Sequence, residues 1–236
     1  MASLSDEVLF CFIRVSFFGF DFCESYICLS FHGEKVVWVG LTGGIASGKS
    51  TVSQFLKEAG AFIVDADTIA HDLLKKGGPA YRSVLNVFGI HILGEDGEID
   101  RSKLGNIVFR DPKRLLALNK IIHPFVFEAA EQERSTIGGM NPHAVIVFDA
   151  PLLIETRAHK KVDMVILVYV DKETQIKRLC ERDGLSRESA EIRIGTQMSL
   201  DEKHGFANEI IDNRKPLHEV REDVLRIYAM LCATGN

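Results

Sequence analysis

The sequence predicts an α/β fold in which a parallel β-sheet lies between two layers of helices. Short apolar runs alternate with helical segments along the chain, and this alternation is typical of a parallel sheet with right-handed crossovers. One of these runs leads into Gly43–Ser50, which matches the pattern GxxxxGK[ST], and a helical segment follows directly. A strand, a glycine-rich loop and a helix in this order indicate the three-layer core of a P-loop nucleotide-binding protein.

Length and composition favour one enzyme-sized domain with an insertion or a tail. Of the 236 residues, 46% are hydrophobic and 26% are charged, so the chain can form a sizeable core. The formal net charge is −5, whereas proteins that bind nucleic acid usually carry the opposite bias, so we expect no nucleic-acid partner. Five cysteines without a CxxC pair favour free thiols in a reducing, cytoplasmic compartment over a disulfide framework.

Residues 1–34 differ from the rest of the chain and are predicted to be an N-terminal extension of unknown role. Their apolar stretch, residues 8–20, contains Arg14 and is shorter than the ~20 apolar residues of a membrane span. Asp6 and Glu7 occupy the place where a secretory signal has basic residues. A mitochondrial presequence is rich in arginine and poor in acids, whereas this segment has one arginine and more acidic residues than that. We therefore expect neither a membrane span nor a secretory signal here, and a mitochondrial location stays an open alternative although the segment is a poor transit peptide.

The regular pattern begins at Lys35. Residues 36–39 predict a buried strand, residues 40–48 a loop and residues 50–59 a helix that Gly60 ends. Residues 61–64 predict a second strand, which ends at Asp65.

Two further apolar runs, at 144–148 and 164–170, predict two more strands. Helices are expected over residues 172–183 and about 216–232, the second with apolar residues at helical spacing. Between residues 68 and 143 the texture changes to mixed helix and polar loops, which predicts an inserted helical subdomain.

The glycine-rich loop predicts an ATP site with Mg²⁺. Its glycines let backbone N–H groups converge on phosphates, and the following helix adds its positive N-terminal end. Lys49 is expected to reach the β- and γ-phosphates, and the Ser50 hydroxyl to ligate Mg²⁺. The candidate nucleotide-binding residues of this loop are Gly43, Ile45, Ala46, Ser47, Gly48, Lys49, Ser50 and Thr51.

Three carboxylates follow predicted strands. Ligands of open α/β sheets bind outside the carboxyl ends of the strands, so Asp65, Asp67 and Asp149 should face the nucleotide. Asp67 is the candidate catalytic base for an acceptor hydroxyl, although Asp65 or Asp67 could instead cap the helix that starts near Thr68. Asp149 is a candidate Mg²⁺ ligand, and the alternative is a turn before Pro151 that merely ends the strand.

Arginines cluster near a predicted lid at residues 181–200. Arg178 and Arg182 lie four residues apart on one helix face, and Arg187 and Arg193 follow. A mobile lid can carry such positive charge to the transferring phosphoryl group. The alternative, a solvated helix that pairs arginine with Glu181 or Glu188, stays open.

Several motifs together resemble the dephospho-CoA kinase family. Residues 40–51 and Asp65-Ala-Asp67 are similar to the start of that family, and the likeness continues in order to about residue 231. The later motifs are Asp100-Arg101, His123-Pro124, Pro151-Leu-Leu153 with Glu155, Gln175 with Arg178, Arg182-Asp-Gly184, Arg193 with Gln197, and Ile211-Asp-Asn213. The resemblance implies one kinase domain over residues 35–234, with a helical CoA-binding subdomain and a small lid.

The resemblance also implies the reaction and the roles of several residues. ATP and dephospho-CoA would give ADP and CoA, with the ribose 3′-hydroxyl as acceptor. Asp67 would be the base on that hydroxyl, with Asp65 among the residues around the substrate. Arg182 and Arg193 would contact phosphates from the lid. Arg101 and His123 would lie near the substrate, and Asn213 near the adenine.

The sequence departs from the family pattern at two places. Ala207-Asn208 stands where the family often has Ala-Asp, and residues 1–34 have no counterpart. The oligomeric state is not predicted.

Three other functions are alternatives to this one. A kinase for another acceptor, such as a nucleoside monophosphate or shikimate, shares the P-loop, but the ordered motifs disfavour it. A GTP-operated switch needs Asn-Lys-x-Asp, whereas Asn119-Lys120 is followed by two isoleucines, and no DxxG element occurs. An inactive binding module whose site the N-terminal segment masks stays an open alternative.

Overall fold

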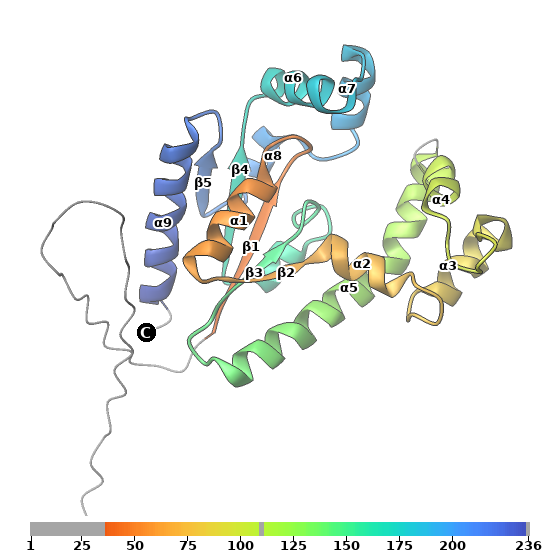
Figure 1. The fold of residues 1–236 in the computed structure, drawn as a ribbon, viewed down its shortest axis with the longest axis horizontal. Coiled ribbons are helices and arrows are strands. Elements are labelled where there is room, and N and C mark those ends of the chain that lie inside the picture. Colours follow the sequence, from red (N-terminus) through yellow and green to blue (C-terminus); the bar gives the residue numbers. More distant parts are fainter. Residues whose placement is uncertain (1–35, 109–110, 235–236) are drawn as a thin grey trace, which may run out of the picture.

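The computed structural model describes residues 36–108 and 111–234, and the predicted extension at residues 1–34 lies outside them. Within the described residues, one parallel sheet of five strands has the order β2-β3-β1-β4-β5 (Figure 1). The strands are β1 (Val37–Gly43), β2 (Phe62–Asp65), β3 (Val145–Asp149), β4 (Met164–Tyr169) and β5 (Glu209–Asp212). This confirms the predicted α/β class with a parallel sheet.

Two layers of helices bury the two faces of the sheet because side chains alternate along each strand. Val39 and Leu41 of β1 pack with α1 (Lys49–Ala59) and α9 (Leu217–Thr234) on one face. Trp38 points to the other face, where it packs in the cluster that holds α2 (Ala66–Leu73) and α5 (Pro112–Met140). All seven residues of β1 are buried, as expected for the central strand.

The predicted elements are confirmed with small shifts at their ends. The first strand is longer than predicted, because it continues through Gly40 to Gly43. Gly40 fits inside it because a Cβ at that position would lie only 2.4 Å from Leu153 Cδ2. Gly60 ends α1 as predicted, with a φ of 115° and its N–H on the carbonyls of Leu56 and Lys57. Strand β5 was not predicted, since its four residues contain only two apolar ones.

Among the described residues between β2 and β3, all regular secondary structure is helical, apart from one isolated bridge between Leu93 and Ile99. Between α2 and α5 lie α3 (Tyr81–Phe88), a short 3₁₀ helix (Ile90–Ile92) and α4 (Arg101–Val108). Figure 1 shows α3 and α4 at the far end of this region from the sheet.

The second half of the chain carries three shorter helices beside the sheet. They are α6 (Lys172–Asp183), α7 (Arg187–Ile194) and α8 (Leu200–His204), and a short 3₁₀ helix (Ala158–Lys161) precedes β4. Ser199 begins α8 with a reciprocal capping box to Glu202. Across the helices of the described ranges, none combines the length and apolar character that a membrane span requires.

Deleting residues 1–34 is expected to leave kcat/KM within a few-fold of the full chain. The alternation of strands and helices begins only after this segment in the sequence, so we expect the core to form without the extension. Activity and melting temperature of the two chains, measured side by side, test this. Loss of activity or solubility on deletion would show that the extension packs on the core.

Candidate active site

The carboxyl ends of three neighbouring strands bring the candidate site together. Asp149, the last residue of β3, lies in register with Leu41 of β1 and with Asp65, the last residue of β2. The glycine-rich loop leaves β1 at the same edge and returns into α1 at Lys49. The predicted loop and two of the predicted carboxylates are therefore neighbours.

The glycine-rich loop has the backbone geometry of an anion site. Gly48 precedes α1 in the left-handed region with a φ of 86°, and no side chain caps the helix. Its first N–H groups are therefore free of side-chain partners and can bind phosphate oxygens. Ala46 also has a positive φ of 59°, and the buried Ser47 Oγ has no partner among the described residues. Strain of this kind at Ala46 is typical of ligand-binding loops.

Polar side chains from the residue after β5 and from α6 donate hydrogen bonds to carbonyls of this loop. The Asn213 amide donates to the Ser47 carbonyl at 2.7 Å, and the Gln175 amide donates to the Ile45 carbonyl at 2.7 Å. Arg178 reaches the carbonyl of Asn213 at 2.8 Å. The Asn213 amide therefore supports the phosphate loop, and the predicted proximity of Asn213 to the adenine stays a prediction. The loop is thus pre-organised by contacts from distant parts of the chain.

Replacing Gly48 by alanine is expected to disrupt this support. A Cβ at Gly48 would lie 1.9 Å from Asn213 Nδ2, so the loop or Asn213 would have to shift. A shift of about 1 Å in the groups that position a substrate can lower the rate about 10²-fold. Gly77 is the matched control, since its φ of 83° is nearly the same and nothing lies within 4 Å of its Cβ position. Kinetics of Gly48→Ala and Gly77→Ala therefore separate the contact from backbone strain alone. Equal activity of the two variants would contradict the assigned role of the contact.

The predicted phosphate and metal residues meet at the end of β3. Lys49 Nζ forms an ion pair with Asp149 Oδ1, and only 17% and 6% of the two side chains are exposed. Ser50, Asp65 and Asp149 line one cavity. A hydroxyl and two carboxylates supply the hard oxygen ligands that Mg²⁺ prefers. Among the described residues, no group of three or more His, Cys, Asp or Glu side chains forms a metal cluster.

The two aspartates after β2 have different environments. Asp65 caps α2, since its carboxylate accepts from the backbone N–H groups of Asp67 and Thr68 at 2.8 and 3.0 Å. Asp67 is therefore not the helix cap. Its pKa is raised, first by its partial burial and then by the neighbouring Asp65 and Asp149, while Lys49 opposes the shift.

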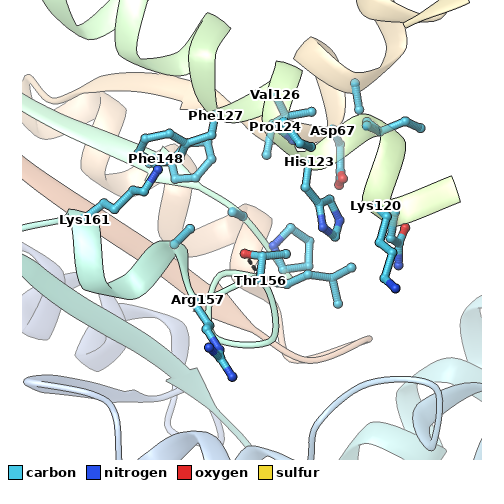
Figure 2. A pocket seen from close by; sticks show the side chains of 18 residues that line it. Asp67, Lys120, His123, Pro124, Val126, Phe127, Phe148, Thr156, Arg157 and Lys161 are labelled. Carbon is cyan, nitrogen blue, oxygen red and sulfur yellow. Dashed lines mark hydrogen bonds between the residues drawn. The ribbon is translucent and has the colours of Figure 1, made fainter. Parts of the chain in front are cut away.

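A largely apolar cavity of about 600 Å³ opens beside Asp67 (Figure 2). Its walls come from α2, from α5, and from the segment that follows β3. The apolar part includes Phe127 and Phe148, whose rings meet edge to face at 6.2 Å between centroids. His123 also lines the cavity, and burial lowers its pKa. A cavity of this size and polarity suits an extended organic acceptor.

The predicted substrate residue Arg101 is not among the residues that line this cavity. It is the exposed first residue of α4. Asp67 and His123 therefore line one cavity, while the role of Arg101 near the substrate stays a prediction.

Two of the predicted lid arginines form ion pairs with the same aspartate. Arg182 and Arg193 both bind Asp183, at 2.7 and 2.8 Å, and all three side chains are partly exposed. Arg187 pairs instead with Glu173 and Glu191 at the surface. These surface pairs fit the alternative of a solvated helix, although with partners other than the two that were expected. The shared partner nevertheless places the two predicted lid residues side by side.

Several residues of the site were not assigned a role by sequence reasoning. Gln175 and Gln197 were noted only as part of the resemblance, yet the Gln197 side chain accepts from Ile45 N–H at 3.2 Å. Lys203 was not noted at all, although it is fully buried within hydrogen-bond reach of the loop. No local pattern predicts such contacts, because more than 100 residues separate the partners.

The departure at Asn208 has a structural explanation. Its side-chain oxygen accepts from Val165 N–H at 2.8 Å, at the start of β4. An aspartate carboxylate could accept the same hydrogen bond, so the substitution keeps the contact.

Comparisons with known proteins agree with this geometry. The family model of dephospho-CoA kinase matches residues 37–219. The chain is similar to a dephospho-CoA kinase of Carboxydothermus hydrogenoformans, with 49% identity over 191 residues that cover 80% of this chain and 91% of the relative. A dephospho-CoA kinase of Syntrophus aciditrophicus is 43% identical over 193 residues, 82% of each chain. The crystal structure of TT1252 from Thermus thermophilus superposes with a TM-score of 0.71 at 30% identity, and covers 83% of this chain and 97% of that one.

Proposed function

The chain belongs to the dephospho-CoA kinase family, and we propose how its residues carry out the reaction. The enzyme transfers a phosphoryl group from ATP to dephospho-CoA and releases ADP and CoA, the last step of coenzyme A biosynthesis. The acceptor is the ribose 3′-hydroxyl. The observation that supports our assignment of residues is the position of Asp67, which lies between the phosphate loop and the apolar cavity.

The ATP phosphates are assigned to the glycine-rich loop. Backbone N–H groups at the start of α1 bind the phosphates, and Lys49 balances the charge that develops during transfer. Asp149 holds Lys49 in place before ATP binds, through their ion pair. In the complex with ATP, Lys49 would exchange part of this contact for phosphate oxygens.

Mg²⁺ is assigned to Ser50 and Asp149. Their hydroxyl and carboxylate oxygens fit a hard cation, and they line the same cavity. When bound, the ion would neutralise phosphate charge, as it does in other kinases.

Asp67 is assigned as the base for the acceptor hydroxyl. Its raised pKa makes it a better proton acceptor than an ordinary aspartate. The 3′-hydroxyl would donate its proton to the Asp67 carboxylate as its oxygen attacks the γ-phosphorus. The bond from that phosphorus to the β–γ bridging oxygen breaks, and ADP leaves.

Dephospho-CoA is assigned to the cavity between α2 and α5. Apolar walls there suit the organic part of the acceptor, and three cationic side chains, Lys120, Arg157 and Lys161, also line the cavity. Residues 68–143 would then form the substrate subdomain. The segment 181–200, which carries Arg182 and Arg193, would form the lid.

A cytoplasmic location is part of the proposal. Cys180 and Cys232 are free thiols, which suits a reducing compartment. Fractionation of host cells followed by immunoblotting tests it, and recovery of the protein outside the cytoplasm would contradict it.

The acceptor assignment can be tested with the 3′-deoxy analogue of dephospho-CoA. We expect this analogue to compete with dephospho-CoA but to yield no phosphorylated product, because it lacks the attacking oxygen. ³¹P NMR of the product formed from dephospho-CoA should show a new phosphomonoester on the ribose 3′ position. Phosphorylation of the 3′-deoxy analogue would contradict the assigned acceptor atom.

A further inference from the structure

Lys203 of α8 is a buried charged side chain that the proposed mechanism does not use. Its side chain is fully buried, and it is the only lysine or arginine among the buried residues of the described ranges. Burial lowers its pKa, and the neighbouring carboxylate of Glu155 opposes that shift. A buried ammonium group is costly unless it is paired and hydrogen-bonded. The fold therefore has to supply partners for it.

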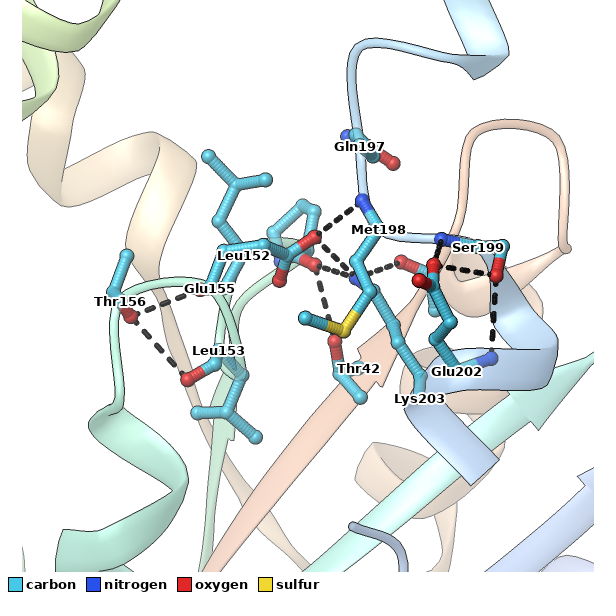
Figure 3. A network of polar contacts seen from close by, with 12 residues as sticks. Thr42, Leu152, Leu153, Glu155, Thr156, Gln197, Met198, Ser199, Glu202 and Lys203 are labelled. Carbon is cyan, nitrogen blue, oxygen red and sulfur yellow. Dashed lines mark hydrogen bonds and ion pairs between the residues drawn. The ribbon is translucent and has the colours of Figure 1, made fainter. Parts of the chain in front are cut away.

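The partners of Lys203 come from the start of the phosphate loop and from the segment after β3, and Figure 3 shows Lys203 beside Thr42 and Glu155. Its ammonium group donates to the Pro151 carbonyl at 2.6 Å and approaches the Gly43 carbonyl at 3.4 Å. Gly43 is the first residue of the phosphate loop, and Pro151 lines the acceptor cavity two residues after Asp149. One cation thus joins the ATP loop to the wall of the acceptor cavity.

Glu155 extends this connection toward the lid segment. Its Oε1 lies 3.0 Å from the Lys203 ammonium group and accepts from Met198 N–H at 3.1 Å. Met198 follows Gln197, whose side chain accepts from Ile45 N–H. Glu155 Oε2 is buried without a partner among the described residues, so Lys203 is the main support of this carboxylate charge.

A second, uncharged contact acts at the same point. The buried Thr42 hydroxyl donates to the Pro151 carbonyl at 3.1 Å, next to the Lys203 ammonium group (Figure 3). The Pro151 carbonyl therefore accepts from β1 and from α8. Two donors on one carbonyl fix the segment after β3 more rigidly than ordinary loop packing does.

We propose that Lys203, together with Glu155, is a positioning residue that fixes the distance between the phosphate loop and the acceptor wall. Neither side chain touches the reacting atoms in this account. Both act through Gly43, Pro151 and Met198, which belong to the ATP loop, the acceptor cavity and the lid segment. In-line transfer depends on this distance, because near-attack geometry requires the reacting atoms about 3–3.5 Å apart. The proposal rests on the acceptor cavity assigned above.

The test compares variants that separate positioning from stability. Lys203→Met alone leaves the Glu155 carboxylate without its cation, so it is expected to destabilise the protein. The double variant Lys203→Met/Glu155→Gln removes both charges and keeps an oxygen that can accept from Met198 N–H. Its melting temperature is therefore expected to return toward that of the wild type. Lys215→Met is the matched control, since it removes a lysine ion pair, with Asp223 at 2.7 Å, on the surface.

The kinetic signature distinguishes positioning from a structural role. In the double variant we expect kcat to fall about 10–10²-fold, with the KM values for ATP and dephospho-CoA changed by less than about threefold. The ratio of ADP released to CoA formed should rise above one, because water reaches a γ-phosphoryl group that the acceptor no longer meets in line. Lys215→Met should keep both the wild-type kcat and a ratio of one.

The result that would overturn the proposal is a double variant with restored stability, wild-type kcat and a ratio of one. A loss confined to the KM values would overturn it as well. If the double variant does not fold, Thr42→Val gives the answer, since it removes only the second donor to Pro151 and is expected to lower kcat in the same direction. A Thr42→Val enzyme with unchanged kcat would then contradict the proposal. Wild-type CoA formation, measured in the same assay, tests the proposed function separately.

Discussion

Lys49→Met is expected to reduce turnover at least about 10³-fold, because the variant lacks the charge that stabilises the transferring phosphoryl group. Methionine keeps most of the apolar stem, so the loss would report the ammonium group itself. The structure adds a second consequence. Lys49 also neutralises the buried Asp149, and removing one partner of a buried ion pair typically costs about 3–5 kcal/mol.

The two consequences can be separated with a second substitution. In Lys49→Met/Asp149→Asn, the uncompensated carboxylate is gone, so the melting temperature should recover while turnover stays lost. Thermal melts and the rate of ADP release are the measurements. An active Lys49→Met protein would remove the P-loop mechanism altogether. Recovery of turnover in the double variant would instead mean that Lys49 acts only by supporting Asp149.

Asp67→Asn is expected to lower kcat about 10²–10⁴-fold, the usual range for a general base, with ATP binding little changed. Asparagine keeps the shape and one hydrogen-bond acceptor but cannot take the proton. The matched control is Asp72→Asn on the same helix, since Asp72 forms an ion pair with Lys75 at the surface. That variant should keep the wild-type kcat.

A Mg²⁺ titration of Asp67→Asn separates a base from a metal ligand. If Asp67 mainly served Mg²⁺, more metal would recover part of the rate. We expect no such recovery. Near-normal kcat at ordinary Mg²⁺ would contradict the base assignment and direct attention to Asp65 or solvent.

The raised pKa of Asp67 makes a further prediction for the same variant. Because the pKa in the folded protein lies above that in the unfolded chain, ionisation of Asp67 costs stability as pH rises through the folded pKa. Asp67→Asn should therefore melt at a higher temperature than the wild type at neutral pH, and the gain should vanish below the pKa of the unfolded chain. In the wild type, kcat/KM should fall on the acid side at a pH above the ordinary aspartate range. Equal melting temperatures at all pH values would contradict the assigned environment of Asp67.

The local parts of the site could be predicted from the sequence. The loop Gly43–Ser50 is a continuous motif, and the strand that ends at Asp149 is a continuous apolar run, so both are visible within a few residues. The sequence could not decide whether Asp65 or Asp67 caps the helix, because an aspartate at either position can do so. Only the hydrogen bonds at Asp65 decide it.

The non-local parts could not be predicted, for a physical reason. Lys203 and Gly43 are 160 residues apart, and a lysine next to an acidic residue in sequence normally indicates a solvated surface. Its burial depends on how α8 packs beside β4 and the phosphate loop. The acceptor cavity has the same origin, since α2, α5 and the segment after β3 form it only once the sheet has brought them together.

The most direct test of the central claim is ADP release by the purified full chain with a panel of acceptors. Dephospho-CoA, AMP and shikimate should each be tested with ATP and Mg²⁺, and the product identified by mass spectrometry. We expect dephospho-CoA to yield one CoA for each ADP, with the other two acceptors giving no more than the background hydrolysis of ATP. A folded protein that forms no CoA from dephospho-CoA, or that phosphorylates AMP or shikimate faster, would contradict the assignment.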